Sequence, residues 1–183
     1  MDTSTRTIYD NLSSEDGTTR SEALSRILEV TEKRVDWAYE VWDELLARLR
    51  DRSNHQRAIA AQLLCNLAKS DSKNRMVEDF DAVMAVTRDE KFVTARHCLQ
   101  STWKVAAAGK KLQGIVLDRL ADRFRDSSAE KNCTLIRFDI IQGLRRLYDV
   151  ADDQTVKALA MKLIETEDDV KYRKKYAGLW KDT

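Results

Sequence analysis

The two histidines are the residues with which a search for metal or acid–base chemistry begins. The chain contains His55 and His97, and three cysteines that lie far apart. It has no HExxH motif and no CxxC pair, the close spacings from which zinc sites are usually built. We therefore expect no metal and no other cofactor, and we interpret both histidines as solvated or capping residues.

Motifs for phosphate binding and for nucleophilic catalysis are absent from the sequence. Gly109 and Gly114 flank two lysines, but no GxxxxGK[ST] loop occurs, and a helix C-cap explains Gly109. No GxSxG motif is present. The acidic pairs at 152–153 and 168–169 stand at expected helix starts, where capping of free N–H groups accounts for them. No residue is therefore assigned a catalytic role.

The composition predicts a helical protein rather than a sheet or a disordered chain. Of 183 residues, 43% are hydrophobic and 34% are charged, and the five glycines and absence of proline leave few turn residues for an all-β fold. The 32 basic residues are balanced by 31 acidic ones. This balance excludes a globally basic nucleic-acid binder and an acidic disordered chain, but it leaves a local basic patch open.

The segment 1–17 is rich in Ser, Thr, Asp and Asn, so we interpret it as a polar, flexible tail and expect a single domain over 18–183. The tail lacks the apolar run of a secretory signal, and no stretch of 18 apolar residues that could cross a membrane occurs. The three cysteines are odd in number and none is in a CxxC pair. These features predict a cytoplasmic protein that does not enter a membrane.

An internal repeat is superimposed on a helical spacing of apolar residues, which recur every three or four positions from residue 18 onward. Four segments align on arginines that are 39, 41 and 36 residues apart, namely Arg57, Arg96, Arg137 and Arg173. Seven positions after the arginines stand Leu64, Trp103, Leu144 and Trp180. Each repeat is therefore a pair of helices whose second helix carries an early arginine and the same buried stripe.

An acidic residue follows the first helix of each repeat. The acids that precede the four arginines are Asp51, Asp89, Asp126 and Glu167, and Glu130 is an alternative to Asp126. An arginine fork can take such a carboxylate with two hydrogen bonds, and the carboxylate can also cap the second helix. We expect a ladder of these pairs to set the register of the repeats, each exposed pair contributing about 0–1 kcal/mol.

These helix pairs of about 37 to 41 residues, with an acid at the inner turn and Arg early in the second helix, resemble HEAT repeats. The related armadillo repeat has a third helix and fits less well. The resemblance covers residues 34–181 and implies an all-α fold, a right-handed α–α superhelix of about four helical hairpins. It makes 18–33 an N-terminal capping helix, and it implies that the second helices line the concave side.

A binding surface follows from that implied geometry. The face opposite the buried stripe lies one, five, eight and nine positions after each arginine. It begins with the neutral residues Ala58, Gln62, Cys65 and Asn66. The expected binding residues on the later helices are His97, Ser101, Lys104, Phe138, Gln142, Arg145, Arg146 and Lys174, with further charge from Lys171, Arg173 and Lys175. This face is either a solvated helix surface or a groove for an acidic peptide or a phosphate backbone.

The leading hypothesis is a non-catalytic scaffold that binds a partner protein through the concave surface. The alternative is nucleic-acid binding, because some HEAT-like proteins grip duplex DNA and a subset are alkylpurine DNA glycosylases. Phe138 and Asp139 would then supply the aromatic side chain and the catalytic carboxylate. A third hypothesis is a lyase or chaperone-like helper for pigment-bearing proteins. The sequence identifies neither the partner nor the oligomeric state.

Overall fold

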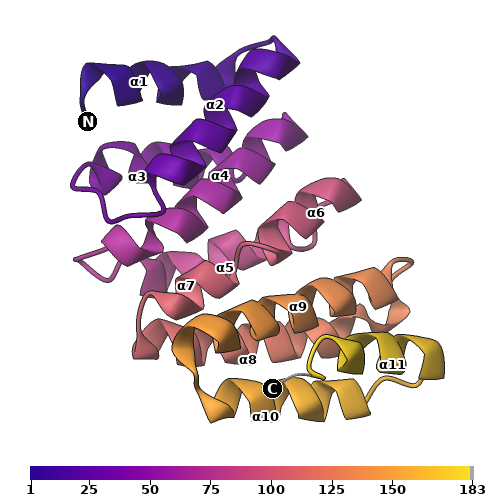
Figure 1. Cartoon of the computed structure of the whole chain (residues 1–183). Coiled ribbons are helices and arrows are strands. Elements are labelled where there is room, and N and C mark those ends of the chain that lie inside the picture. The colour runs from indigo at the N-terminus through magenta and orange to yellow at the C-terminus, as the bar shows by residue number, and fades with distance from the viewer. Residues whose placement is uncertain (182–183) are drawn as a thin grey trace. The chain divides into compact units, whose positions relative to one another are not determined.

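The computed structural model describes residues 1–181, and this part of the chain is helical and contains no β-strand. The chain packs as two compact units. Unit 1 spans Met1–Ser101, and unit 2 begins at Thr102. Each unit consists of helices that are consecutive along the chain (Figure 1).

Unit 1 has two layers of helices that follow one another in chain order. Helices α3 and α5 form one layer, and α2, α4 and α6 lie side by side in the other (Figure 1). The helices α1 and α2 pack together, as do α3 with α4 and α5 with α6. The elements are α1 (Thr3–Asp10), η1 (Asn11–Ser13), α2 (Gly17–Val30), α3 (Ala38–Arg48), α4 (Asn54–Leu67), η2 (Ala68–Ser70), α5 (Met76–Val86) and α6 (Phe92–Leu99).

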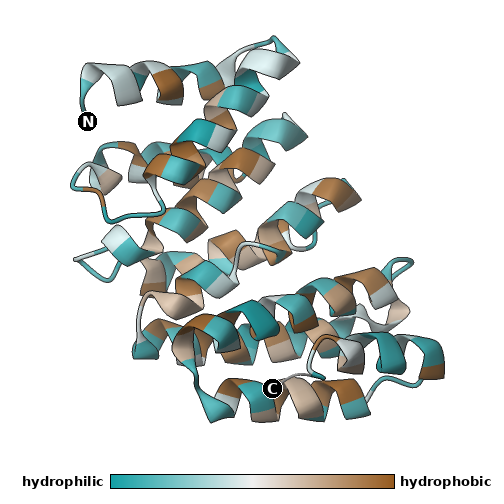
Figure 2. Ribbon diagram, viewed as in Figure 1, coloured by the Kyte–Doolittle hydropathy of each residue, from teal (hydrophilic) through white to brown (hydrophobic). Residues whose placement is uncertain are grey.

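The core of unit 1 comes from the apolar stripes of these helices. Hydrophobic and hydrophilic residues alternate along these helices, as the brown and teal bands in Figure 2 show. Trp42 and Phe80 from the first helices and Leu64 from α4 are fully buried. Burying one such side chain stabilises the fold by roughly 1.5–3 kcal/mol, so packing of the stripes supplies most of the stability of the unit.

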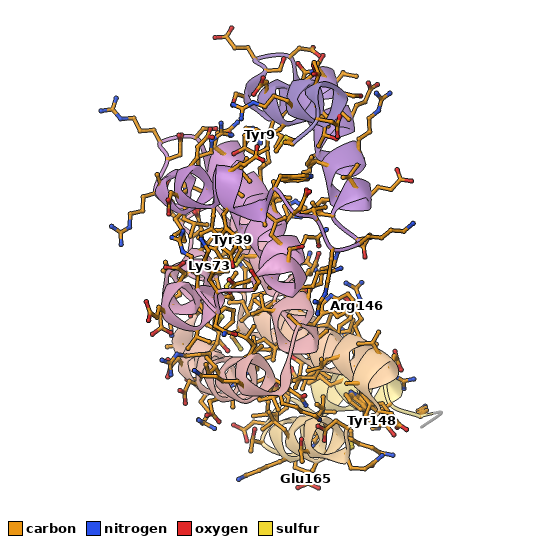
Figure 3. All side chains as sticks on the ribbon, turned by 90° about the vertical axis from the view of Figure 1, so that its left-hand side faces the viewer. Tyr9, Tyr39, Lys73, Arg146, Tyr148 and Glu165 are labelled. Atoms are coloured by element: carbon orange, nitrogen blue, oxygen red, sulfur yellow. The ribbon has the colours of Figure 1, made fainter. Side chains whose placement is uncertain are left out.

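The turn between α4 and α5 is held by Tyr39 of the preceding helix pair. The Tyr39 hydroxyl donates to Asp71 Oδ1 at 2.5 Å and accepts from the Lys73 backbone N–H at 2.7 Å. The Lys73 ammonium lies 4.6 Å from the centre of the Tyr39 ring, and Figure 3 shows the two side chains near each other. This contact orders a turn in which Asn74 adopts a positive φ of 57°.

The expected flexible tail over 1–17 is instead a helix that packs on unit 1. Helix α1 starts at the Asp2 cap, whose carboxylate accepts from the Thr5 backbone N–H at 2.9 Å. Tyr9 is only 1% exposed, and its ring lies between the guanidinium groups of Arg6 and Arg48 at 5.6 and 5.5 Å. The prediction failed because α1 has too few apolar residues to show a helical period.

Helices α1 and α2 form a hairpin of the same kind as the later ones, rather than a tail and a capping helix. Arg20 precedes Arg57 by 37 residues, which matches the spacing of the repeat. Ala23 and Ile27, three and seven positions after Arg20, are buried. Arg20 Nη1 donates to the backbone carbonyls of the turn before α2, as Arg57 Nη1 does before α4. The repeat therefore begins one hairpin earlier than expected.

Unit 2 is also built in two layers. Helices α8 and α10 contact each other in one layer, and α9 contacts α7 and α11 in the other. The two helices of the hairpin α8–α9 contact each other, as do those of α10–α11, and α7 packs on α8 and α9 on α10 as well. The elements are α7 (Trp103–Ala107), α8 (Lys110–Asp126), η3 (Ser127–Ala129), α9 (Cys133–Ala151), α10 (Gln154–Glu165) and α11 (Val170–Gly178).

The boundary between the units falls inside a segment that was expected to be one helix. The repeat predicted a continuous helix from Arg96 to Ala106, but α6 ends at Leu99 and α7 begins at Trp103. The three residues between them are Gln, Ser and Thr. The Ser101 hydroxyl donates to the His97 carbonyl at 2.8 Å, and such side-chain bonds compete with helical ones. The polar triplet therefore interrupts the helix.

Candidate functional site

The polar residue three positions before each second helix shapes the turn. We call this place the turn position. In four turns its side chain accepts a hydrogen bond from the backbone N–H two residues later, at 2.7–3.2 Å. The residues at the turn position are Ser14, Asp51, Asp89, Glu130 and Glu167. Glu130, rather than Asp126, therefore stands at this place in the third predicted repeat.

Two arginine–acid pairs each join one hairpin to the next, whereas the sequence had left open which turn each arginine binds. Arg57 Nε and Nη2 donate to the two oxygens of Asp89 at 2.5 and 2.9 Å. Arg137 Nη1 donates to Glu167 Oε2 at 3.1 Å. Hydrogen bonds from Arg57 lower the pKa of the Asp89 carboxyl below its usual value. Each arginine thus takes the turn-position acid that follows it by about 30 residues.

Glu130 is bound within its own hairpin by an arginine that the repeat did not predict. Arg123 Nη1 and Nη2 donate to Glu130 Oε1 and Oε2 at 2.5 and 2.9 Å. Arg123 is 2% exposed, so this two-point pair compensates a charge that is almost fully buried.

The predicted binding residues are divided between the two units. In unit 1, His97 lies exposed on α6, and Ser101 follows that helix. The other residues lie in unit 2 on α7, α9 and α11, and they are Lys104, Phe138, Gln142, Arg145, Arg146 and Lys174. They therefore do not form one continuous set on a single unit.

The surface of unit 2 formed by α9 and α11 combines basic and aromatic side chains. Lys175 Nζ lies 4.6 Å from the centre of the half-buried Phe138 ring, and the fully buried Tyr176 packs against Phe138 with the ring centres 6.3 Å apart. Lys171 and Lys175 lie 6.0 and 5.8 Å from the ring of Tyr172. Tyr172 was missed at the sequence level, although the alternating run KYRKKY contains the signal. We call the exposed and half-buried residues of this set, namely Phe138, Lys171, Tyr172 and Lys175, the α9–α11 surface.

The two neighbouring arginines of α9 have different roles. Arg145 Nε donates to Asp149, its Nη1 donates to the Leu179 carbonyl at 3.1 Å, and its guanidinium lies over Trp180. Arg145 therefore holds α11 in place. Arg146 is exposed on the same helix (Figure 3), and no ion pair with another described residue is found for it. Of these two arginines, Arg146 is therefore the one that is available to a ligand.

Asp139 does not have the exposure that a catalytic carboxylate requires. Its side chain is 0% exposed on α9, whereas the neighbouring Phe138 is half-buried. A nucleotide flipped out of DNA has no access to a carboxylate in this position. The expected pairing of Phe138 and Asp139 in one open site is therefore not formed.

Unit 2 also contains a pocket of about 350 Å³ between α8, α9 and α10. Its floor includes Phe124 and Leu163, and its cations include Arg125, Arg137 and Lys162. Arg137 is already bound to Glu167 and lies 4.7 Å from the centre of the Phe124 ring. Arg137, one of the cations that line this pocket, is thus already held by contacts within the fold.

A groove of about 400 Å³ lies between the second helices α2, α4 and α6 of unit 1. We call it the unit 1 groove. Both histidines of the chain line it. Its other lining residues are Gly17, Arg20, Ser21, Leu24, Asn54, Ala58, Ile59, Gln62, Val93 and Thr94. Three residues of the predicted face, Ala58, Gln62 and His97, are therefore brought together here.

The remaining residues of the first predicted row lie in the core. Cys65 and Asn66 are 0% and 1% exposed. Asn66 Nδ2 donates to the Leu28 carbonyl and to Thr31 Oγ1, both at 3.0 Å, so it ties α4 to the end of α2. The stripe on α4 is wider than the repeat predicted because α4 packs against helices on several sides.

Comparisons with known proteins do not place the chain in a family. No protein-family model matches it, and no curated protein is significantly similar to it. Among residues 1–181, no three His, Cys, Asp or Glu side chains lie close enough together to hold a metal ion. In the same part of the chain, every helix is too short or too polar to cross a membrane.

Proposed function

We propose that this protein is a non-catalytic scaffold that binds a partner protein through its layer of second helices, as the resemblance to HEAT repeats implies. The unit 1 groove carries this proposal, because three successive second helices leave an open, mixed apolar and polar surface that their own packing does not fill. Chain-order packing of hairpins within each unit supports it further. In this proposal the second helices form the concave side of a superhelix.

An affinity capture with matched surface variants tests this proposal. The wild-type protein and a variant with Gln62→Glu and His97→Glu, which place two charges in the unit 1 groove, are compared with Glu22→Lys on the exposed side of α2. A partner identified by mass spectrometry is then purified and titrated. We expect the partner to bind the wild type and the Glu22 variant but not the groove variant. Equal binding by all three proteins contradicts the proposal.

Nucleic-acid binding is the second candidate, and the α9–α11 surface favours it. Lysines over aromatic rings can contact phosphates while the rings stack on bases. Burial of Asp139 argues for binding without glycosylase chemistry.

Retention on heparin and on single- and double-stranded DNA tests this candidate. The informative variant is Arg146→Glu with Lys174→Glu, because both residues are exposed and Arg145 has a structural role. We expect salt-sensitive retention that this variant loses. No retention of the wild type at about 0.1 M salt, where screening is still moderate, eliminates nucleic acid as the ligand.

A further inference from the structure

We propose that Arg20 in the unit 1 groove binds a carboxylate of an acidic peptide segment of the partner, in the two-point manner in which Arg57 binds Asp89. This inference rests on the proposed scaffold function and specifies the chemistry of its ligand. It depends on a comparison between two arginines that hold equivalent places in successive hairpins.

The template for the site is the Arg57–Asp89 pair. Arg57 Nη1 donates to the carbonyls of Asp51 and Arg52 in the turn before α4, at 2.8 and 3.1 Å. These bonds aim the other edge of the guanidinium, Nε and Nη2, at the Asp89 carboxylate. The turn thus orients the arginine before the acid is bound, and a pre-oriented fork loses less entropy on binding.

Arg20 has the same support but no acid. Its Nη1 donates to the carbonyls of Ser14 and Glu15 at 2.8 and 3.4 Å. Its Nε and Nη2, which correspond to the nitrogens that bind Asp89, donate to none of the described residues. Asp51, the turn-position acid of the next hairpin, bonds to the Ser53 backbone N–H and forms no ion pair with Arg20. The carboxylate-binding edge is therefore vacant.

The surroundings of Arg20 suit an anionic, partly apolar segment. No acidic residue lines the groove, whereas Arg20, His55 and His97 do. Asp16, which caps α2, accepts from the Thr19 backbone N–H at 2.7 Å. This hydrogen bond and, to a lesser extent, the charge of Arg20 lower the pKa of the Asp16 carboxyl, but no ion pair joins the two side chains. Leu24 and Ile59 provide an apolar surface, and Val93 at the rim is 64% exposed. An Asp or Glu flanked by an apolar side chain matches this lining in charge and polarity.

The test uses labelled peptides of about ten residues that carry one Asp or Glu between leucines. Each has a control peptide in which Asn or Gln replaces the acid, which we call its neutral twin. A peptide of this length can span a groove of this size. Binding is followed by fluorescence anisotropy and by the NMR signal of the Arg20 Nε–H group. We expect the acidic peptides, but not their neutral twins, to bind and to shift that signal. Loss of the two-point contact in Arg20→Gln should weaken binding by roughly tenfold or more.

Two further variants keep the result interpretable. Arg26→Gln removes an exposed arginine of the same helix outside the groove and should leave binding unchanged. Arg20→Lys keeps the charge but loses the fork, so it should also bind weakly, and it serves if Arg20→Gln fails to fold. Equal binding of acidic peptides and neutral twins, or an unshifted Arg20 signal at millimolar peptide, overturns the inference. A partner captured by the wild type and retained equally by Arg20→Gln overturns it while leaving the scaffold function intact.

Discussion

Arg57 and Asp89 stand on successive hairpins and meet through two hydrogen bonds, Nε to Oδ2 at 2.5 Å and Nη2 to Oδ1 at 2.9 Å. Their side chains are 14% and 5% exposed, so water weakens this pair less than a surface salt bridge. The Asp89 carboxylate also accepts from the Lys91 backbone N–H at 2.8 Å. One side chain therefore shapes its own turn and fastens the preceding hairpin.

Asp89→Asn should lower the free energy of unfolding by about 1–3 kcal/mol, because the Arg57 charge loses its partner in a partly buried place. Urea unfolding followed by tryptophan fluorescence measures this change. Glu90→Gln is the control, since this neighbouring side chain is exposed, and it should change the free energy by less than about 0.5 kcal/mol. Equal effects of the two substitutions would show that the pair contributes little.

The contribution of Asp89 should depend on pH. Arg57 lowers the pKa of Asp89 in the folded state below the unfolded value of about 3.9, so the pair stabilises the protein above that pH. As pH falls below about 4, the folded carboxylate must be protonated and this stabilisation is lost. The difference in unfolding free energy between the wild type and Asp89→Asn should therefore shrink from pH 6 to about pH 3. A difference that stays constant across this range contradicts the assignment.

Tyr9 should anchor α1. Replacing this buried ring by alanine leaves a cavity and removes the contacts with Arg6 and Arg48, so Tyr9→Ala should cost about 3–5 kcal/mol. Thr7→Ala, an exposed substitution on the same helix, provides the comparison. Hydrogen exchange of the α1 amides gives an independent measure, because they should be protected in the wild type and not in Tyr9→Ala. Unprotected wild-type amides would restore the picture of a flexible tail.

The Arg123–Glu130 pair should matter more than a surface pair of the same charge types. Glu130→Gln removes the carboxylate from a guanidinium that is 2% exposed, so it should destabilise unit 2 by about 2–4 kcal/mol. The exposed pair between Arg125 and Asp122 supplies the control, and Asp122→Asn should cost about 0–1 kcal/mol. Thermal unfolding of both variants under one buffer condition compares them directly.

Tyr176 should make unit 2 sensitive to alkaline pH. Burial raises the pKa of its hydroxyl above the ordinary value, and the hydroxyl donates to the Thr134 carbonyl at 2.7 Å. Tyr176→Phe should cost about 1 kcal/mol at pH 8 through the lost hydrogen bond. Above a pH of about 10 this tyrosine ionises in the unfolded wild type, which stabilises the unfolded state and lowers the free energy of unfolding. The difference in unfolding free energy between the wild type and Tyr176→Phe should therefore decrease. An increase would contradict the burial of the hydroxyl.

Much of the helical architecture was predictable because buried residues recur with a regular period. Arg57 and Arg137 occupy equivalent places in their hairpins and bind Asp89 and Glu167, the acids at the next turn positions, a pairing that the sequence had left open. The first hairpin was missed because α1 is short and polar, and Arg20 was therefore not aligned with the later arginines. Its place 37 residues before Arg57 was the available signal.

The candidate surfaces were less predictable than the helices. The repeat correctly grouped Ala58, Gln62 and His97 on one side of two helices. It also placed Cys65 on that side, although packing against more than one neighbour buries this residue. A repeat in the sequence gives the direction in which a residue points around its helix, but it does not show which faces of that helix are buried by neighbouring helices. The role of Arg145 in holding the Leu179 carbonyl could not be read from it either.

Ser14 shows that the two duties of the turn position are separable. Its hydroxyl closes the first turn by accepting from the Asp16 backbone N–H at 3.2 Å, yet it carries no charge for an arginine to hold. Serine in place of an acid at a later turn position should therefore preserve the conformation of that turn but remove the ion pair with the arginine of the preceding hairpin. Evolution or design can then change the strength of the contact between any two successive hairpins with a single substitution, without altering the hairpins themselves.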